Sequence, residues 1–359
     1  MKVGIMTFPH SPSFGASLQM YALYEVLSSM GNEVYVINYI NSYMRNKKHI
    51  YGDKTYNILR YAASKLVGYP SKIKFKKFEK KISMYPQKVT SDVKELNEIS
   101  KNFQFVICGS DQIWNPDITG HDLSYFLNFC DDECTRVSFA PSFGVTNLED
   151  KYSEAILKEL MKFKNISLRE QTGQAIVEGI TGKKYPVVVD PTMLLDTDKW
   201  STLCIDKRNL PKRYIADFTF NQNQEVIEFM THISEVERIP IIQVGGNLVT
   251  KLSGKLTTGA IGPQEWLSVI KNADIVVTDS FHGAVFSILF EKKMFVSLAS
   301  STNTKLKMLL ELFEMENRTI DSRQYEDYED TDYNKVNEIL VTERKRSIKF
   351  LLDSIGLEG

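Results

Sequence analysis

The pattern of apolar and polar positions at the N-terminus predicts a strand, a helix and a second strand. An apolar run over Lys2–Met6 predicts the first strand. After a loop rich in Pro, Ser and Gly, apolar residues recur at helical spacing from Ala16 to Met30, and Gly31 ends the helix. Val34–Ile37 predicts the second strand. This order is that of a βαβ unit, whose first loop faces the ligand side of the sheet.

The same alternation continues along the chain and restarts after the polar run Asp206–Pro211, which predicts a domain linker. Before the linker, further strands are predicted at Phe105–Cys108, Arg136–Ala140, Asn165–Leu168 and Val187–Val189. After it, strands are predicted at Tyr214–Phe218, Ile239–Val244, Ile275–Thr278 and Met294–Leu298, with helices between them. Residues 41–100 show no clear pattern, and a long amphipathic helix over about Tyr333–Leu352 closes the chain.

Two successive α/β halves predict two Rossmann-like domains that face a cleft. The expected parts are an N-terminal domain over 1–205, a C-terminal domain over 206–332, and a helix over 333–359 that packs back across the domains. The length of 359 residues favours two domains, because single cores usually stop growing at about 250–300 residues.

Composition excludes several classes of protein. The chain is 43% hydrophobic and 25% charged, which is typical of a globular protein. Its net charge of -1 argues against broad nucleic-acid binding, because that function usually needs a strong basic field. The chain opens directly with a strand instead of a signal peptide, and no apolar run approaches the ~18 residues that span a membrane. We expect a cytoplasmic protein.

The four cysteines are too few and too scattered for a disulfide framework, which indicates a reducing environment. Cys130 and Cys134 have the spacing of metal ligands, but only acidic residues lie between them and no second Cys/His pair follows. We expect small buried or half-buried residues there. Asp111, Asp190 and Asp279 fall on three separate predicted loops, so the sequence predicts no metal site.

Six lysines lie close together in the segment Lys72–Lys81, around Ile73, Phe75 and Phe78. A solvated helix face is the simpler explanation. The alternative is adhesion to anionic lipid headgroups or to a lipid-linked pyrophosphate, to which each basic residue contributes about 1 kcal/mol. Adhesion of this kind would place the protein at the inner face of the cell membrane.

The stretch Asp274–Phe290 combines a strand, a turn and an apolar helix, and it carries His282. The β-branched run Ile275–Thr278 predicts a buried strand, and Ser280–Gly283 predicts a tight exit into the helix. Because ligands of parallel α/β sheets bind at the carboxyl ends of the strands, His282 is expected at the mouth of a cleft. A histidine that only caps the turn is the alternative.

The loop after Phe105–Cys108 carries polar groups suited to a hydroxyl-rich ligand. It holds Ser110, Asp111, Gln112 and Trp114. Carboxylates and amides pair with sugar hydroxyls, and tryptophan offers a flat apolar face. The alternative is a Ser/Asp helix cap with a core tryptophan.

Arg169 follows the predicted strand Asn165–Leu168 and is therefore expected at another strand end on the ligand side. A guanidinium there can hold a carboxylate or phosphate through two parallel hydrogen bonds, which lysine cannot do. Pairing with Glu170 or another neighbour is the structural alternative.

Several motifs together resemble the polysaccharide pyruvyl transferase family. In chain order they are Gly4–Phe8, Gly15–Gln19, Gly109–Asn115, Ser142–Gly144, Ser167–Glu170, Asp190–Thr192, Glu265–Leu267 and Thr278–Gly283. Each motif is weak alone, but their order and number are specific and they cover nearly the whole chain.

The resemblance implies a fold similar to that of GT-B glycosyltransferases. It also implies transfer of pyruvate from phosphoenolpyruvate to a sugar of a polysaccharide precursor, giving a cyclic ketal across two hydroxyls, with no further cofactor. An acceptor linked to undecaprenyl pyrophosphate would suit the lysine-rich segment. In that family the residues matching Arg169 and His282 belong to the donor site. The C-terminal domain, which carries His282, is the expected donor side, and the N-terminal domain is the expected acceptor side and also contributes Arg169 to the donor site.

The expected donor-binding residues are Arg169, Ser280, Phe281, His282, Gly283 and Lys305. The expected acceptor-binding residues are Gly15, Ser110, Gln112 and Trp114. His282 is the expected general acid and base, and Asp111 is expected to orient or deprotonate the acceptor hydroxyl. Backbone N–H groups at Gly283 and Ala284 are expected to help hold the donor anion.

The sequence departs from the family pattern at several positions. Ser280 stands where some members carry arginine, and Lys305 stands where many do, so Lys305 could supply a charge without the bidentate fork. Ser13–Gly15 differs from the usual Asn-Tyr-Gly, which leaves the acceptor open. Two rival functions remain: a GT-B glycosyltransferase that uses a nucleotide sugar, and a non-catalytic glycan-binding or assembly protein.

Overall fold

The computed structural model describes residues 1–45, 70–207, 209–221, 223–245, 256–298 and 304–357. The chain forms two compact units: unit 1 is Met1–Tyr61, Glu79–Leu195 and Glu343–Gly359, and unit 2 is Ala62–Phe78 and Asp196–Thr342. The boundary therefore falls at 195/196 and not at 205/206. The C-terminal helix α14 (Tyr333–Ile355) is not a separate part, since it begins in unit 2 and ends in unit 1.

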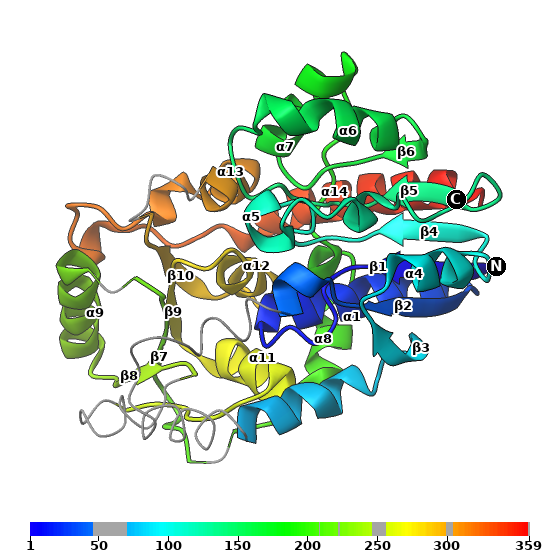
Figure 1. Ribbon diagram of the computed structural model, residues 1–359. Coiled ribbons are helices and arrows are strands. Elements are labelled where there is room, and N and C mark those ends of the chain that lie inside the picture. Colours follow the sequence, from blue (N-terminus) through cyan, green and yellow to red (C-terminus); the bar gives the residue numbers. More distant parts are fainter. Residues whose placement is uncertain (46–69, 208, 222, 246–255, 299–303, 358–359) are drawn as a thin grey trace, which may run out of the picture. The chain divides into compact units, whose positions relative to one another are not determined.

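Unit 1 is built on a six-stranded parallel sheet (Figure 1). Its strands are β1 (Lys2–Met6), β2 (Glu33–Tyr39), β3 (Met84–Thr90), β4 (Phe105–Cys108), β5 (Thr135–Ser138) and β6 (Phe163–Ile166), in the order β3-β2-β1-β4-β5-β6. The chain runs outward from β1 to β3 and then returns to place β4 on the other side of β1. The β1/β4 junction is thus a topological switch point, outside which ligands of such sheets bind.

Helices and one large apolar cluster cover this sheet. The helices are α1 (Phe14–Ser29), α4 (Val93–Ser100), α5 (Pro116–Thr119), α6 (Asp150–Leu160) and α7 (Gln171–Thr181), with 3-10 turns η1 (Leu123–Phe126) and η2 (Pro191–Met193). The cluster joins Met6, Ile37 and Val106 of the sheet to Leu96 and Ile99 of α4. Apolar burial of this kind fixes the strands whose ends carry the polar site.

Unit 2 contains a four-stranded parallel sheet. Its strands are β7 (Ile215–Phe218), β8 (Ile241–Gln243), β9 (Ile275–Thr278) and β10 (Lys293–Val296), in the order β10-β9-β7-β8. Its other elements are α8 (Thr197–Leu203), α9 (Gln224–Glu237), α11 (Pro263–Asn272), α12 (Phe281–Leu289), α13 (Thr304–Leu312), η3 (Glu316–Arg318) and η4 (Tyr325–Asp327). The strand order reverses at β7/β9, so this junction is the second switch point.

The apolar pattern located the central strands well and the edges poorly. The predictions for β4 and β9 are confirmed at both bounds. The strand predicted at Val187–Val189 is wrong, because Val187 forms only an isolated bridge with Leu168 before the chain enters η2. Strand β3 was not predicted, since it lies at the sheet edge, has only one fully buried residue and contains a proline.

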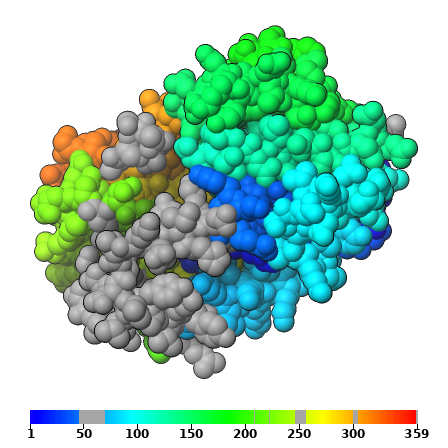
Figure 2. All heavy atoms as spheres, viewed as in Figure 1, coloured from blue at the N-terminus to red at the C-terminus, as the bar shows by residue number. Residues whose placement is uncertain are grey.

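The lysine-rich segment begins as a helix over residues 70–79 and presents most of its lysines to solvent. Figure 2 shows this light-blue stretch at the molecular surface. Phe75 and Phe78 point inward and are buried, so they do not join the lysines on the outer face. Lys74 pairs instead with Glu265. Among the described residues, no helix has the length and hydropathy needed to cross a membrane.

Candidate functional site

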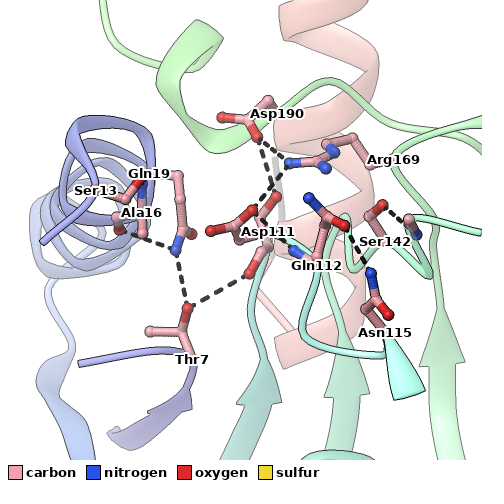
Figure 3. A network of polar contacts seen from close by, with 12 residues as sticks. Thr7, Ser13, Ala16, Gln19, Asp111, Gln112, Asn115, Ser142, Arg169 and Asp190 are labelled. Atoms are coloured by element: carbon pink, nitrogen blue, oxygen red, sulfur yellow. Dashed lines mark hydrogen bonds and ion pairs between the residues drawn. The ribbon is translucent and has the colours of Figure 1, made fainter. Parts of the chain in front are cut away.

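Polar side chains meet at the β1/β4 switch point of unit 1 (Figure 3). Thr7 follows β1, and its hydroxyl donates to the carbonyl oxygen of Ser110, which follows β4 (3.4 Å). Gln19 of α1 donates from Nε2 to Thr7 Oγ1 (2.9 Å) and to the Ala16 carbonyl (3.1 Å). The first turn of α1, which also contains Gly15, is therefore tied to the ends of both strands.

Arg169 is the centre of a buried ion-pair network in the same place. Its Nη1 donates to Asp190 Oδ2 at 3.2 Å, and its Nε donates to Glu170 Oε2 at 3.3 Å. Asp111 Oδ1 lies 3.9 Å from Nη1. The structural alternative for Arg169, pairing with its neighbours, is thus confirmed. Figure 3 shows Arg169, Asp111 and Asp190 turned toward one another.

The network keeps this guanidinium charged. Burial alone would lower the pKa of Arg169, but the negative charges of Glu170, Asp190 and Asp111 outweigh burial and raise it. Asp190 is held in turn by Ser110 Oγ (3.1 Å) and by the backbone N–H and hydroxyl of Thr192. Removing the arginine would therefore leave buried carboxylates without their shared cation.

Asp111 is the member of this network whose carboxylate reaches the surface, with 19% of the side chain exposed. It has a φ of +74°, in the left-handed region that is costly for most residues. The Gln112 backbone N–H donates to Asp111 Oδ1 at 2.8 Å. The backbone carbonyl of Asp111 accepts from the Ser142 N–H at 2.9 Å. Because its backbone is held in this uncommon conformation and its carboxylate is oriented, Asp111 is a candidate catalytic residue.

Gln112 is fixed beside Asp111 by a close approach of Gly144. Gln112 Oε1 accepts from Asn115 Nδ2 at 2.7 Å. Gly144 has a φ of +65°, and a Cβ there would lie 2.0 Å from Gln112 Oε1. Only glycine fits that position, which explains the Ser142–Gly144 motif.

Two predicted acceptor-binding residues lie below this surface. Trp114 is 1% exposed, stacks on Phe126 with ring centroids 4.8 Å apart, and donates from Nε1 to the Tyr125 carbonyl. The prediction that its face receives a sugar is wrong, and the alternative of a core tryptophan is confirmed. Ser110 is fully buried and supports Asp190, so its predicted contact with an acceptor is also wrong.

An apolar cavity of about 40 Å³ lies beyond the carboxyl ends of β1 and β2. It is lined by Phe8, Tyr39, Met44 and Tyr125, with Ser11 among its polar neighbours. Tyr39 donates its hydroxyl to Asp122 Oδ2 at 2.7 Å. The aromatic lining of this small cavity therefore comes from largely buried residues that the sequence pattern did not single out.

The switch point of unit 2 carries His282 on the first turn of α12. Ser280 is the N-cap, and its hydroxyl accepts from the Gly283 N–H at 3.4 Å. Thr278 at the end of β9 donates from Oγ1 to the Phe218 carbonyl of β7 at 2.8 Å. His282 is half-buried, and the Phe281 ring stands edge-on to it at 5.2 Å. Its predicted place at a strand end is confirmed.

Two details of the predicted donor site differ in the structure. The predicted tight exit Ser280–Gly283 is the cap and first turn of a longer helix. The Gly283 and Ala284 N–H groups bond to Ser280 Oγ and to the Ser280 carbonyl. The prediction that these two N–H groups hold the donor anion is therefore wrong, because the helix already uses them.

Gly283 and Asp279 have structural tasks that explain their motif. A Cβ on Gly283 would lie 2.3 Å from Thr278 Oγ1, so glycine allows α12 to approach β9. Asp279 accepts from the backbone N–H groups of Phe220 and Asn221, both at 2.8 Å, and so holds the loop after β7. Lys305 lies in the first turn of α13, an element separate from the His282 turn.

The structure thus brings Asp111, Gln112 and Arg169 together in unit 1 and places Gly15 in the first turn of α1. In unit 2, Ser280, Phe281, His282 and Gly283 form the cap and first turn of α12. The sequence reasoning gave no role to Thr7 or Gln19. The sequence could have indicated both residues, because Thr7 directly follows the predicted strand β1 and Gln19 lies one helical turn beyond Gly15. Among the described residues, no group of three or more His, Cys, Asp and Glu could hold a metal ion.

A comparison with protein-family models gave a match to polysaccharide pyruvyl transferase over residues 14–301. The chain belongs to the polysaccharide pyruvyl transferase family. Membership supports a transferase whose family acts on polysaccharides. The matched range runs from the first turn of α1 to beyond the His282 turn, and it leaves out β1 and Thr7.

Solved structures show the fold of this pyruvyl transferase family member to be similar to GT-B-like proteins. A putative UDP-N-acetylglucosamine 2-epimerase from Listeria monocytogenes is 11% identical, with 98% of this chain and 90% of that chain covered and a TM-score of 0.51. Anabaena Alr3699/HepE, solved with UDP-glucose, is 9% identical, with 98% and 100% covered and a TM-score of 0.50. A search of curated proteins found no match.

Proposed function

We propose that this protein transfers pyruvate from phosphoenolpyruvate to two hydroxyls of a sugar in a polysaccharide precursor, forming a cyclic ketal. Family membership supports the transfer. The single observation that carries the proposal is the half-buried imidazole of His282 on the first turn of α12, at the β7/β9 switch point. Histidine is the side chain best suited to give and take a proton near neutral pH.

In the proposed reaction, one sugar hydroxyl adds to the central carbon of phosphoenolpyruvate and the methylene carbon takes a proton. His282 supplies that proton as general acid. Loss of phosphate then leaves an oxocarbenium-like centre, and the second hydroxyl attacks it while giving its proton to the now neutral His282, which is thereby restored as an acid. Asp111 is the proposed base for an acceptor hydroxyl, because its carboxylate is oriented and partly exposed.

We propose two roles for Arg169, and the structure supports one of them more than the other. The family resemblance predicts that it contacts the donor anion, and this stays a prediction. Its bonds to Asp190 and Glu170 and its 3.9 Å approach to Asp111 support a positioning task, in which the guanidinium fixes the Asp111 carboxylate. The cleft that would bring Arg169 and His282 onto one donor also stays a prediction, and so does the part of Lys305 in donor binding.

We propose a lipid-linked acceptor as the extension of this function. The support is the exposure of Lys72, Lys76, Lys77, Lys80 and Lys81. Exposed lysines attract a pyrophosphate or an anionic leaflet through charge alone. Replacing these five lysines by glutamine should weaken sedimentation of the protein with anionic vesicles and should not change its sedimentation with neutral vesicles. If the variant and the wild type sediment equally with anionic vesicles, the proposal of a lipid-linked acceptor loses this support.

The test of the proposed function begins with donor binding. A ligand that binds only the native state raises the free energy of unfolding, by about 2.7 kcal/mol at a hundredfold excess over Kd. The melting temperature rises as a result. Phosphoenolpyruvate should raise it, and UDP-sugars alone should not. Release of inorganic phosphate in the presence of an acceptor, with a product heavier by the pyruvyl ketal, completes the assignment. A shift with UDP-sugars and release of UDP would favour a glycosyltransferase instead.

A further inference from the structure

One large apolar side chain projects from the carboxyl edge of the unit 2 sheet. Phe220 lies two residues beyond β7, and 72% of it is exposed, more than for any other large hydrophobic residue that the structure describes. Single exposed apolar residues are common on protein surfaces, and Val236 of α9, at 45%, is an example. Phe220 differs from such residues in its position and in the way its backbone and ring are held.

The position of Phe220 is beside the turn that carries His282. Strands β7 and β9 are parallel neighbours, and Phe218 is paired with Thr278 at their carboxyl ends. Two residues beyond this pair come Phe220 on one side and Ser280, the N-cap of α12, on the other. Phe220 and the first turn of α12 therefore leave the sheet at the same switch point, which is where ligands of such sheets bind.

Two buried carboxylates hold the backbone of the loop that carries Phe220. Asp279 accepts from the backbone N–H groups of Phe220 and Asn221, both at 2.8 Å. Asp217 Oδ1 accepts from the backbone N–H of Thr219 at 3.2 Å and from its hydroxyl at 2.6 Å. Hydrogen bonds to an ionised carboxylate are stronger than neutral ones, so the loop is fixed at the point where Phe220 leaves it.

The Phe220 ring rests on a packed aromatic base. It stands edge-on to the Phe218 ring, with centroids 5.3 Å apart. Phe218 is 7% exposed and packs edge-on against the fully buried Trp266, also at 5.3 Å. Edge-to-face packing is a preferred arrangement of aromatic rings, and it orients the Phe220 ring as well as locating it. The exposed surface of Phe220 is therefore a flat apolar face in a defined place.

A fixed aromatic face of this kind suits a sugar better than it suits phosphoenolpyruvate. The faces of a pyranose ring consist largely of C–H bonds and its hydroxyls point outward from the rim, so it can lie on an aromatic ring with its hydroxyls free. Phosphoenolpyruvate is small and highly charged, and its charged groups lose hydration at an apolar surface. Because Trp114 is in the core, the aromatic face that the sequence predicted for the acceptor is not available there.

We propose that Phe220 is an acceptor-binding residue, on whose ring the sugar stacks with its reacting hydroxyls toward His282. This inference rests on the proposed function, in which the sugar hydroxyls react beside the imidazole. Asp279 binds the Phe220 loop and lies three residues before His282, so the ring and the imidazole are attached to one hydrogen-bonded framework. Phe220 thereby helps to determine which face of the sugar is bound and which hydroxyls react.

Saturation-transfer difference NMR tests this binding without the donor. The probes are the methyl β-glycosides of glucose, galactose and mannose, and irradiation of the aromatic protons of the protein identifies the sugar protons that lie against a ring. With the wild type, at least one glycoside should show transfer concentrated on the C–H protons of one face. Titration of that signal gives the affinity.

Three variants of Phe220 separate a flat ring from apolar bulk. Phe220→Ala should weaken binding of the glycoside about tenfold, the effect of losing one aromatic contact. Phe220→Leu should weaken it similarly, because leucine is apolar but has no flat face, and Phe220→Trp should restore binding. Val236→Ala is the matched control and should bind the glycoside as the wild type does. Phosphoenolpyruvate should raise the melting temperature of the wild type and of Phe220→Ala equally.

Several results would overturn the inference. They are an absence of transfer to all three glycosides, unchanged binding in Phe220→Ala, an equal loss in Val236→Ala, and loss of the wild-type phosphoenolpyruvate shift in Phe220→Ala. The sugar measurement needs no donor and no turnover. Stacking on Phe220 can therefore be found in a protein that transfers no pyruvate, and transfer can be found in a protein whose Phe220 binds no sugar, so failures of the two proposals are distinguishable.

Discussion

The two switch points hold their functional side chains by different interactions, buried ion pairs in unit 1 and neutral hydrogen bonds in unit 2. In unit 1, Arg169 and the carboxylates of Asp111, Glu170 and Asp190 form a buried charge network. In unit 2, the turn that carries His282 is built from a Thr278 hydroxyl bond and a Ser280 cap. Breaking a buried ion pair is costly because it leaves an uncompensated charge, whereas a cap is worth only about 1 kcal/mol. Mutations in the unit 1 site should therefore also lower the stability of the fold, whereas mutations in the unit 2 site should be able to change activity without changing stability.

His282→Gln should have the largest effect, and it should fall on activity alone. We expect a decrease in kcat of about 10²–10⁴-fold, the contribution typical of a positioned acid or base, with little change in melting temperature. Turnover is measured by phosphate release from phosphoenolpyruvate. His232→Gln on α9, a half-buried histidine paired with Glu326, is the control and should keep full activity. Near wild-type turnover of the His282 variant would remove the acid/base assignment.

Arg169→Met should have the largest effect on stability. Loss of one partner from a buried ion pair costs about 3–5 kcal/mol, and here three carboxylates share the cation. The midpoint of urea unfolding followed by tryptophan fluorescence measures the change. Arg213→Met is the control, because Arg213 is exposed and its pairs should contribute about 0–1 kcal/mol. Equal midpoints for the two variants would show that the network does not stabilise unit 1.

Gly283→Ala should lower stability by about 1–3 kcal/mol through overpacking. The added Cβ would meet Thr278 Oγ1, whose bonds to the Phe218 carbonyl and from the Ser280 N–H leave it little room to move. Gly179→Ala in α7 is the matched control. That glycine has open space around its Cβ position, so alanine should stabilise by up to ~1 kcal/mol. Calorimetric melting of both variants makes the comparison, and shifts of the same sign would contradict it.

Ser280→Ala should have the smallest effect, about 0.5–1 kcal/mol, because its cap bond is long at 3.4 Å. Ser13→Ala removes the corresponding cap of α1, also at 3.4 Å, and should cost the same amount. Thermal melting measures both, and Ser280→Asp should restore the cap. A much larger loss for Ser13 would mean that the charge network of unit 1 extends to the first turn of α1.

The sequence by itself determined the central strands and the positions that follow them. Strands β4 and β9 are buried on both faces, so they appear as unbroken apolar runs whose bounds can be seen in the sequence. The residues directly after such strands must lie at the carboxyl edge, which is why the placements of Asp111, Arg169 and His282 at strand ends were predictable. The order of the motifs was sufficient to indicate the family, which the family match then confirmed.

Only the tertiary structure decided which of these polar and aromatic residues face outward and which are buried. Trp114 is in the core because Phe126 covers it, and Arg169 is paired because Asp190 comes 21 residues later to meet it. Strand β3 at the sheet edge and the place of residues 70–78 in unit 2 were also beyond the local pattern. Burial and charge pairing depend on residues distant along the chain, and periodicity reports only on neighbours.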